Sequence, residues 1–274
     1  MKIQLFTLFI ILLGLIGSPV FASDLAKEKR WADQIVDGII VGDPIWLQAD
    51  GNKFLGIYAE NETDNAKGAV ILLHGSGVHP NWPDIIQPLR SELPAHGWTT
   101  LSIQMPILAN DAKYSEYAPL IKEVPGRINA AIDFLNNKSF QNIIIVAHSL
   151  GTTMANSYLA NNAKRIRAYV AIGMNGSDSG PDELNNFNYL QKITLPTYDI
   201  YGSEDLKSVL DSVKQRKQAL RKAENENFRQ VSVLGANHFF NGLDADLIRH
   251  IKSWISNHAG RLPQADETPE EPEK

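Results

Sequence analysis

Two short runs of the chain are apolar without a break, and they constrain the fold more than any other feature. Residues 68–73 read Gly-Ala-Val-Ile-Leu-Leu, and after Asn142 residues 143–146 read Ile-Ile-Ile-Val. Runs of this kind are typical of strands buried on both faces, as in a parallel sheet covered by helices on both sides. The sequence therefore predicts an α/β fold around a central parallel sheet.

Helix-like and strand-like segments alternate along most of the remaining chain. Helices are expected at residues 85–93, 124–135, 149–161, 206–221 and 246–257. Further strands are expected at residues 99–104, 166–172, 197–201 and 230–234. Such alternation predicts one mostly parallel sheet with helices on both faces.

An antiparallel hairpin is expected to open this sheet. Asp50-Gly51-Asn52 separates the alternating segments 44–49 and 53–60, and Asp-Gly in that setting is a strong hairpin signal. A helix is expected before it, around residues 26–36. Residues 175–191 are too few for a large lid, so we expect a single compact domain over residues 23–260 with a minimal lid.

The two ends of the chain are predicted to lie outside this domain. Residues 1–22 have the features of a signal peptide: Lys2, an apolar run over residues 5–16, and the small-residue pattern Val20-Phe21-Ala22. This predicts export to the periplasm or secretion. A bilayer span needs about 20 apolar residues, so an uncleaved N-terminal anchor is the less favoured alternative, and no stable membrane insertion is expected after signal removal. Residues 261–274 are rich in proline and acidic residues and are expected to form a disordered tail.

Charge and cysteine content narrow the function. Much of the net charge of −5 lies in the acidic tail, so it says little about the substrate, and no nucleic-acid footprint is expected. The chain has no cysteine, which excludes a thiolate nucleophile and thiolate metal sites. Six basic side chains over residues 207–222 are expected to form a solvated helix face: Lys207, Lys214, Arg216, Lys217, Arg221 and Lys222.

The strongest chemical signal is a serine between a buried strand and a helix. Residues 147–151 read Ala-His-Ser-Leu-Gly, which matches the G-x-S-x-G nucleophile elbow with alanine in the first glycine position. The turn is tight, so small residues must flank it to let the strand and helix backbones approach. The pattern predicts Ser149 as a nucleophile.

A general base and an orienting carboxylate are expected on later loops. His238 follows the last predicted strand, and Asp205 follows the strand at residues 197–201. The order Ser149, Asp205, His238 is the order that strand–turn–helix serine hydrolases use. Glu204 and Asp178 are alternative acids, whereas Asp199 lies within a strand and is expected to be structural.

The loop of residues 74–80 is expected to complete the site. Its backbone can approach a substrate oxygen closely, so the Ser76 N–H, with Gly77 as second choice, and the Leu150 N–H are the predicted oxyanion-hole donors. Candidate pocket residues are Gly75, Gly77, His79, Trp82 and Met105. His74 and His148 flank the motifs, but we expect them to pack or hydrogen-bond rather than to bind a metal.

Four segments together resemble the α/β-hydrolase superfamily, over about residues 44–258: residues 72–77, 147–151, 201–205 and 235–238. Residues 95–106, with an N-terminal signal, further resemble a bacterial family of uncharacterised exported α/β-hydrolase-like proteins. The resemblance implies a single-domain α/β-hydrolase fold and acyl transfer to water without a cofactor. It does not imply a particular substrate.

The favoured hypothesis is a serine hydrolase that cleaves a carboxylic ester or related acyl compound through an acyl-enzyme. In it His238 is the base and Asp205 holds the imidazole, so activity should fall as His238 becomes protonated. The expected partner is a small-molecule, lipid or glycan acyl substrate, with no metal and no nucleic acid. The alternatives are an acyltransferase acting on a glycan or lipid acceptor, and a non-catalytic envelope binding protein on the same fold.

Overall fold

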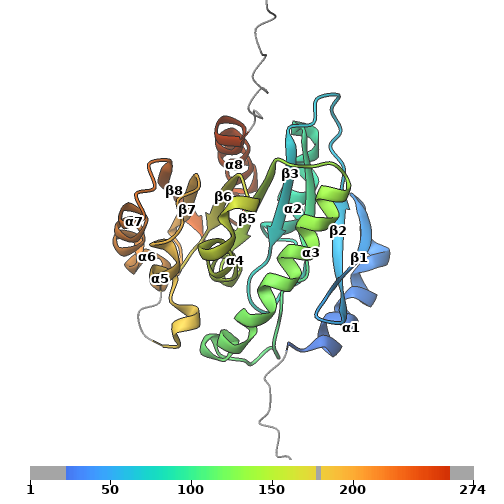
Figure 1. The fold of residues 1–274 in the computed structure, drawn as a ribbon, viewed down its shortest axis with the longest axis horizontal. Helices are drawn as coiled ribbons and strands as arrows, with labels where there is room; N and C mark the ends of the chain where they lie inside the picture. The colour runs from blue at the N-terminus through green and yellow to red at the C-terminus, as the bar shows by residue number, and fades with distance from the viewer. Residues whose placement is uncertain (1–22, 177–179, 260–274) are drawn as a thin grey trace, which may run out of the picture.

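The protein folds around one eight-stranded sheet. The computed structural model describes residues 23–176 and 180–259 (Figure 1), so the predicted signal peptide, Asp178 and the predicted tail lie outside the described residues. The strand order is β1-β2-β4-β3-β5-β6-β7-β8, with antiparallel pairing for β1–β2 and β2–β4 and parallel pairing elsewhere. The strands are β1 (Asp43–Ala49), β2 (Asn52–Ala59), β3 (Gly68–Leu73), β4 (Trp98–Ile103), β5 (Ile143–His148), β6 (Ala168–Ile172), β7 (Thr197–Glu204) and β8 (Phe228–Asn237).

The predicted hairpin is present as β1 and β2. Ala49 pairs with Asn52, which leaves a two-residue loop in which both Asp50 (φ 50°) and Gly51 (φ 80°) have positive φ. Positive φ at both central positions is the signature of a type I′ turn, whose twist matches that of the flanking strands. The hairpin predicted from Asp50-Gly51 is therefore confirmed.

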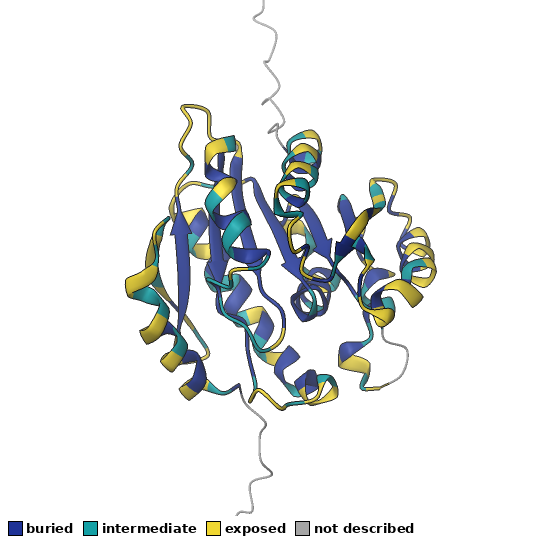
Figure 2. Ribbon diagram, turned by 180° about the vertical axis from the view of Figure 1, so that it is seen from behind, coloured by how far each residue is buried: buried dark blue, intermediate teal, exposed yellow. Residues whose placement is uncertain are grey.

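Helices cover both faces of the sheet. Successive residues of β3 alternate between two cores, with Ile71 and Leu73 on one side and Val70 and Leu72 on the other. The first core is closed by α3 and α4 and the second by α2 and α8, and Figure 2 shows buried strands beneath helices whose outer faces are exposed. These helices are α2 (Ile86–Glu92), α3 (Val124–Asn137), α4 (Leu150–Asn162) and α8 (Asp244–Ala259).

Shorter elements complete the domain. The predicted N-terminal helix is α1 (Leu25–Ile35), which packs Ala32 against Leu55 and Ile57 of β2. In the segment expected to be too short for a lid, the described residues form short helices, including α5 (Asn186–Leu190). Short 3-10 helices lie at Val36–Gly38, Pro94–His96, Tyr114–Glu123, Ala163–Arg165 and Asp182–Leu184. No helix within the described ranges is long and apolar enough to cross a membrane.

The helix expected over residues 206–221 is in fact two helices. They are α6 (Lys207–Asp211) and α7 (Val213–Lys222), separated at Ser212. The Ser212 hydroxyl donates to the carbonyl oxygens of Ser208 and Val209. Because such side-chain bonds compete with the helical backbone ladder, they favour a break at this position.

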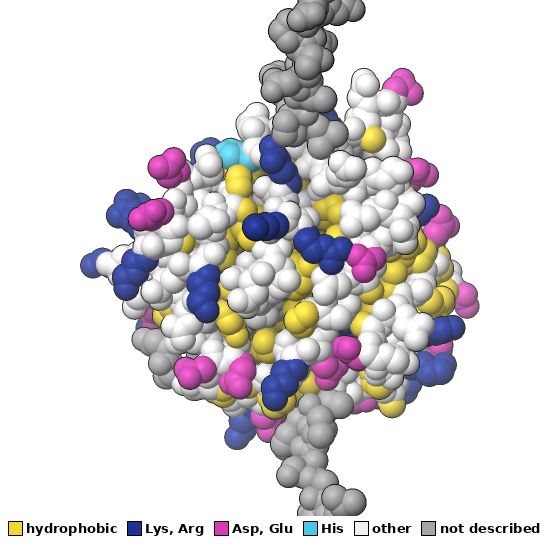
Figure 3. Space-filling view, viewed as in Figure 1, with side chains coloured by type: hydrophobic (Ala, Val, Ile, Leu, Met, Phe, Trp, Pro, Cys, Tyr) yellow, Lys and Arg dark blue, Asp and Glu magenta, His cyan; other side chains and the backbone are white. Residues whose placement is uncertain are grey.

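The basic face predicted for this segment is also only partly correct. Arg216 is fully buried and pairs with the fully buried Asp199 of β7, with Nε 2.9 Å from Oδ2. Asp199 is therefore structural, as predicted, and Arg216 is its partner rather than a solvated charge. Elsewhere, on the face shown in Figure 3, basic and acidic side chains are interspersed.

Removing one partner of this buried pair should strongly destabilise the protein. Arg216→Met leaves the Asp199 carboxylate buried without its guanidinium, so we expect a loss of about 3–5 kcal/mol in the free energy of unfolding. Urea denaturation measures this loss. Lys217→Met, on the exposed side of the same helix, should change little, and the double variant Asp199→Asn/Arg216→Met should recover part of the loss. A single variant as stable as the wild type would contradict the assignment.

Candidate active site

Ser149 lies on a strained turn between β5 and α4. Its backbone has φ 53° and ψ −124°, a region that side-chain-bearing residues rarely occupy. The Ser149 N–H donates to the Ile172 carbonyl at 3.0 Å, and the Thr152 N–H donates to the Ser149 carbonyl at 2.9 Å. Hydrogen bonds thus fix both backbone groups of the strained residue.

Close backbone packing explains the small residues around this turn. A Cβ atom at Gly151 would lie 2.5 Å from the His74 carbonyl oxygen, and one at Gly75 would lie 3.0 Å from Cβ of Ser149. Ala147 is buried in the strand before the turn and is accommodated there. The two glycines let the start of α4 and the loop after β3 approach each other directly beside Ser149.

The structure brings Ser149, His238 and Asp205 together in one hydrogen-bonded chain. His238 Nε2 lies 2.9 Å from Ser149 Oγ, and His238 Nδ1 lies 2.6 Å from Asp205 Oδ1. The three residues come from the ends of β5, β8 and β7, which lie at one edge of the sheet because these strands are parallel. His238 and Asp205 are each only 6% exposed.

Asp205 is held as a carboxylate. Burial alone would raise its pKa, but the hydrogen bond and charge interaction with His238 and the backbone N–H groups of Leu206 and Gly202 together lower the pKa below its ordinary value. Leu206 donates to Oδ1 at 2.7 Å and Gly202 to Oδ2 at 3.2 Å. Of the alternative acids, Glu204 is exposed and Asp178 lies outside the described residues.

Two buried histidines support the site as neutral hydrogen-bonding groups. His74 Nδ1 donates to the Gly75 carbonyl at 2.8 Å, and its Nε2 accepts from the Met105 N–H at 2.9 Å. His148 Nε2 donates to the His238 carbonyl at 3.0 Å. Burial lowers the pKa of His74 and of His148 to about 3 in each case. Both residues hydrogen-bond to backbone groups, and no group of three or more metal-ligating side chains occurs in the part of the chain that the structure describes.

The predicted oxyanion donors lie on the two segments that meet at Ser149. Leu150 is the first residue of α4, so its N–H has no acceptor within the helix. Ser76 follows Gly75 on the loop after β3 and lines the cavity next to Ser149. Among residues 23–176 and 180–259, we find no hydrogen-bond acceptor for either N–H.

A small cavity of about 210 Å³ opens beside Ser149 and His238. Of the predicted pocket residues, Gly75 and Trp82 line it, whereas Gly77, His79 and Met105 do not. Met105 is fully buried in the core, and His79 lies between the Trp31 and Trp82 rings, at 5.3 Å and 5.4 Å between centroids. The interpretation of Met105 as a pocket residue is thus corrected, because its side chain packs inward.

Several neighbours of the site did not figure in the sequence interpretation. Leu206 and Phe239 line the cavity directly after Asp205 and His238, together with Val78 and Ile86. The sequence could have indicated Leu206 and Phe239, because they directly follow Asp205 and His238. Gly173, at the end of β6, has φ 58°, and a Cβ there would lie 3.0 Å from the His238 ring.

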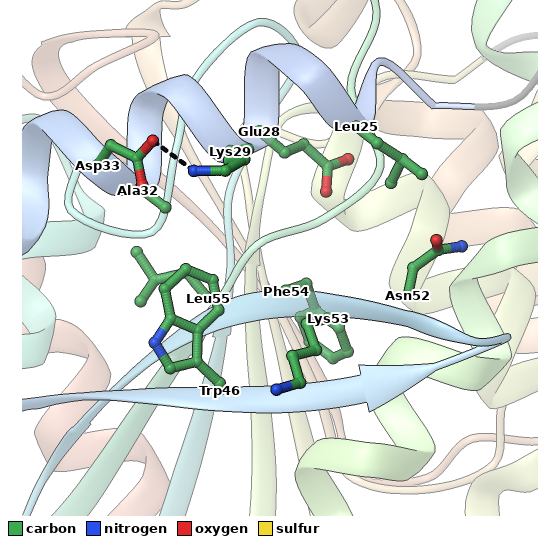
Figure 4. A pocket seen from close by; sticks show the side chains of 10 residues that line it. All are labelled: Leu25, Glu28, Lys29, Ala32, Asp33, Trp46, Asn52, Lys53, Phe54 and Leu55. Carbon is green, nitrogen blue, oxygen red and sulfur yellow. Dashed lines mark hydrogen bonds and ion pairs between the residues drawn. The ribbon is translucent and has the colours of Figure 1, made fainter.

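A larger cavity of about 430 Å³ lies away from this site, between α1 and the β1–β2 hairpin (Figure 4). Figure 4 shows Trp46, Phe54 and Leu55 below the helix, with the Lys29–Asp33 ion pair on the helix itself. The lining contains neither serine nor histidine. It therefore offers no nucleophile–base pair.

The strand order, together with a serine after β5, a carboxylate after β7 and a histidine after β8, defines an α/β-hydrolase fold. Solved structures agree on the fold. Est1E from Butyrivibrio proteoclasticus has a TM-score of 0.62 and 15% identity, covering 80% of this chain and 100% of its own. A dienelactone hydrolase from Anabaena variabilis has a TM-score of 0.64 and 19% identity, covering 80% and 98%. An α/β serine hydrolase without a lid from Xanthomonas campestris has a TM-score of 0.59 and 13% identity, covering 82% and 98%.

The chain belongs to the family described as "Protein of unknown function (DUF3530)", whose model matches residues 41–124 and 109–257. No curated protein sequence matches the chain. The predicted α/β-hydrolase fold and the predicted resemblance to an uncharacterised family are confirmed by the solved structures and by the family match.

The buried histidines should make the folded protein sensitive to acid. Unfolding exposes His74 and His148, whose pKa values return to about 6.5, so the unfolded chain binds more protons below that pH and stability falls as pH falls toward 3. Near pH 5, each of the two histidines lowers the free energy of unfolding by about 1.4 kcal/mol for every pH unit of acidification. Urea denaturation at pH 7, 6 and 5 should therefore show a shallower pH dependence for His148→Gln than for the wild type. His74→Gln is the matched second variant, and parallel curves would contradict this interpretation.

Proposed function

We propose that the protein is a serine hydrolase that cleaves a carboxylic ester or related acyl compound through an acyl-enzyme. The observation that carries the proposal is the continuous chain Ser149 Oγ–His238–Asp205, with distances of 2.9 Å and 2.6 Å, beside a cavity. A neutral imidazole between a hydroxyl and a carboxylate is the arrangement that activates a serine nucleophile. The dienelactone hydrolase and the serine hydrolase that have the same fold support the same class of reaction.

This geometry supports the following sequence of steps. Ser149 Oγ attacks the acyl carbon as His238 Nε2 takes the hydroxyl proton, and Asp205 stabilises the imidazolium that forms. The Ser76 and Leu150 N–H groups bind the oxyanion, each donor lowering the barrier by about 2.7–4 kcal/mol. The alcohol leaves with the proton from His238, so the acyl group stays on Oγ. Water, deprotonated by His238, then attacks this ester, releases the acid and restores the serine.

The cavity favours a small acyl group. Its volume of about 210 Å³ lies below the roughly 300–1,000 Å³ of pockets that hold drug-sized ligands. Trp82, Ile86, Leu206 and Phe239 give it apolar walls. We place the reaction outside the cytoplasm, in the periplasm or after secretion, on the strength of the signal-like residues 1–22.

A fluorophosphonate probe tests the nucleophile without assuming a substrate. Wild-type protein should be labelled and Ser149→Ala should not, because only an activated serine reacts. Hydrolysis of p-nitrophenyl acetate should fall at least about 10⁴-fold in Ser149→Ala and in Asp205→Asn, the latter because the imidazole loses its orienting carboxylate. Labelling of Ser157→Ala, on the same helix α4, should match the wild type. Folded wild type that is not labelled would favour a binding protein, and equal labelling of Ser149→Ala would refute Ser149.

The cavity volume predicts a short acyl chain. Across p-nitrophenyl esters of two to ten carbons, kcat/KM should peak at about four carbons or fewer and fall at least about tenfold by ten, because further methylenes find no buried surface. Trp82→Ala enlarges the cavity and should move the peak to longer chains. Trp46→Ala, at a half-exposed tryptophan on β1 far from the site, is the matched control. A wild-type rate that rises steadily through ten carbons would contradict the volume argument.

A further inference from the structure

Ser23 is bound by charged side chains from a distant part of the chain. Its backbone N–H donates to Glu123 Oε1 at 2.9 Å, and its hydroxyl donates to Glu123 Oε2 at 2.7 Å. The same hydroxyl accepts a hydrogen bond from Arg127 Nη2 at 3.2 Å. Ser23 is only 7% exposed. Ser23 is thus buried and hydrogen-bonded to Glu123 and Arg127 rather than exposed on the surface.

This site has more negative than positive charge. Arg127 is shared between Glu28, at 2.8 Å and 3.0 Å, and Glu123, at 3.6 Å. The Arg127 and Glu28 side chains are 5% exposed and that of Glu123 is 26% exposed. One guanidinium therefore serves two largely buried carboxylates, which leaves one negative charge without a counter-ion among residues 23–176 and 180–259. Burial raises the pKa of Glu28, and Arg127 only partly opposes this shift.

Within the part of the chain that the structure describes, the other charged groups near Ser23 do not supply the missing cation. The Lys27 ammonium on α1 is bound by the Leu108 carbonyl and by Asn110 Oδ1, at 2.7 Å each. Asp24 caps α1 through the Lys27 N–H, and Asp50 lines the same small cavity beside Ser23. Both of these groups are acidic.

The sequence indicates how a cation can arise at this position. Val20-Phe21-Ala22, the small-residue pattern of a signal-peptide cleavage site, ends directly before Ser23. Hydrolysis of the Ala22–Ser23 peptide bond by an export peptidase adds water, so Ala22 leaves with a carboxylate and Ser23 gains an α-ammonium group. We propose that this bond is the processing site and that Glu123, with Glu28 and Arg127, forms a binding site for the new α-ammonium group.

The proposal does not depend on the hydrolase reaction, although hydrogen bonds connect this site to His74 beside the candidate active site. Arg127 Nη1 also donates to the Gln104 carbonyl at 3.0 Å, and the next N–H, that of Met105, donates to His74. The Asp24 N–H donates to the Ile107 carbonyl at 2.8 Å. The mature amino terminus would therefore be joined to the segment that supports the loop of Gly75.

The first test identifies the amino terminus. The full chain is expressed with residues 1–22 in a bacterial host, and the exported protein is analysed by intact mass and amino-terminal sequencing. A mature chain that begins at Ser23 supports the proposal. A chain that begins at any other residue, or a full-length exported chain, overturns it.

The second test measures the ammonium site. Chains that begin at Ser23 or, one residue longer, at Ala22 are released from a fusion protein, and their melting temperatures are compared at pH 7. The Ser23 form should melt about 2–4 °C higher, the shift expected for one modest interaction in a domain of this size. Glu123→Gln should abolish this difference, whereas Glu92→Gln, on α2, should preserve it. Equal melting temperatures of the two wild-type forms would overturn the proposal.

The pH dependence separates a charge interaction from a simple hydrogen bond. An α-amino group ordinarily has a pKa of about 7.7–8.0, and a neighbouring carboxylate raises it. The added stability should therefore be complete below about pH 7.5 and disappear as pH rises through the raised value, by about pH 10. A melting-temperature difference that persists unchanged at pH 10 would show that charge is not involved and would contradict the ammonium site.

Discussion

The strained turn at Ser149 depends on close contact between β5, α4 and the loop after β3. A backbone with φ 53° costs on the order of 1–3 kcal/mol and persists only where its surroundings enforce it. The Ile172 carbonyl binds the Ser149 N–H from the neighbouring strand, and Gly151 lets α4 begin against the His74 carbonyl. The parallel sheet thus supplies the contacts that hold Ser149 in place, and the same edge of the sheet brings His238 and Asp205 to it.

Neutral histidines connect the parts of the site that the sheet alone does not join. His74 links the loop of Gly75 to the segment after β4, and His148 links β5 to the backbone of His238. Protonation would remove the lone pair with which His74 accepts from Met105, so its low pKa keeps that contact intact down to acid pH. The free energy of unfolding is therefore lower at acid pH, because the unfolded chain binds protons that the folded chain does not bind.

Local pattern was sufficient to predict the strands and to place Ser149, Asp205 and His238 at the same end of the sheet. The buried strands carry apolar signals and the hairpin strands an Asp-Gly signal, and Ser149, Asp205 and His238 follow β5, β7 and β8 in the chain, so position along the chain implied position in space. Arg216 shows where this reasoning fails. Its helical neighbours are solvated cations, and only the fold reveals Asp199 beneath it, 17 residues earlier on β7. The prediction that Met105 lines the pocket was wrong for the same reason. The sequence places Met105 near the site but does not show that its side chain points into the core.

The N-terminal segment was the hardest to interpret because its partners lie far along the chain. Glu28 of α1 binds Arg127 of α3 across 99 residues, and Ser23 binds Glu123 across 100. Neither pair leaves a periodic signal, yet together they fix the start of the domain to the first turn of α3 and the residue before it. A charge placed at Ser23 by cleavage would complete this network only after export. The stability of the domain would then depend on where the chain is cut, a property that hydrophobic pattern alone does not encode.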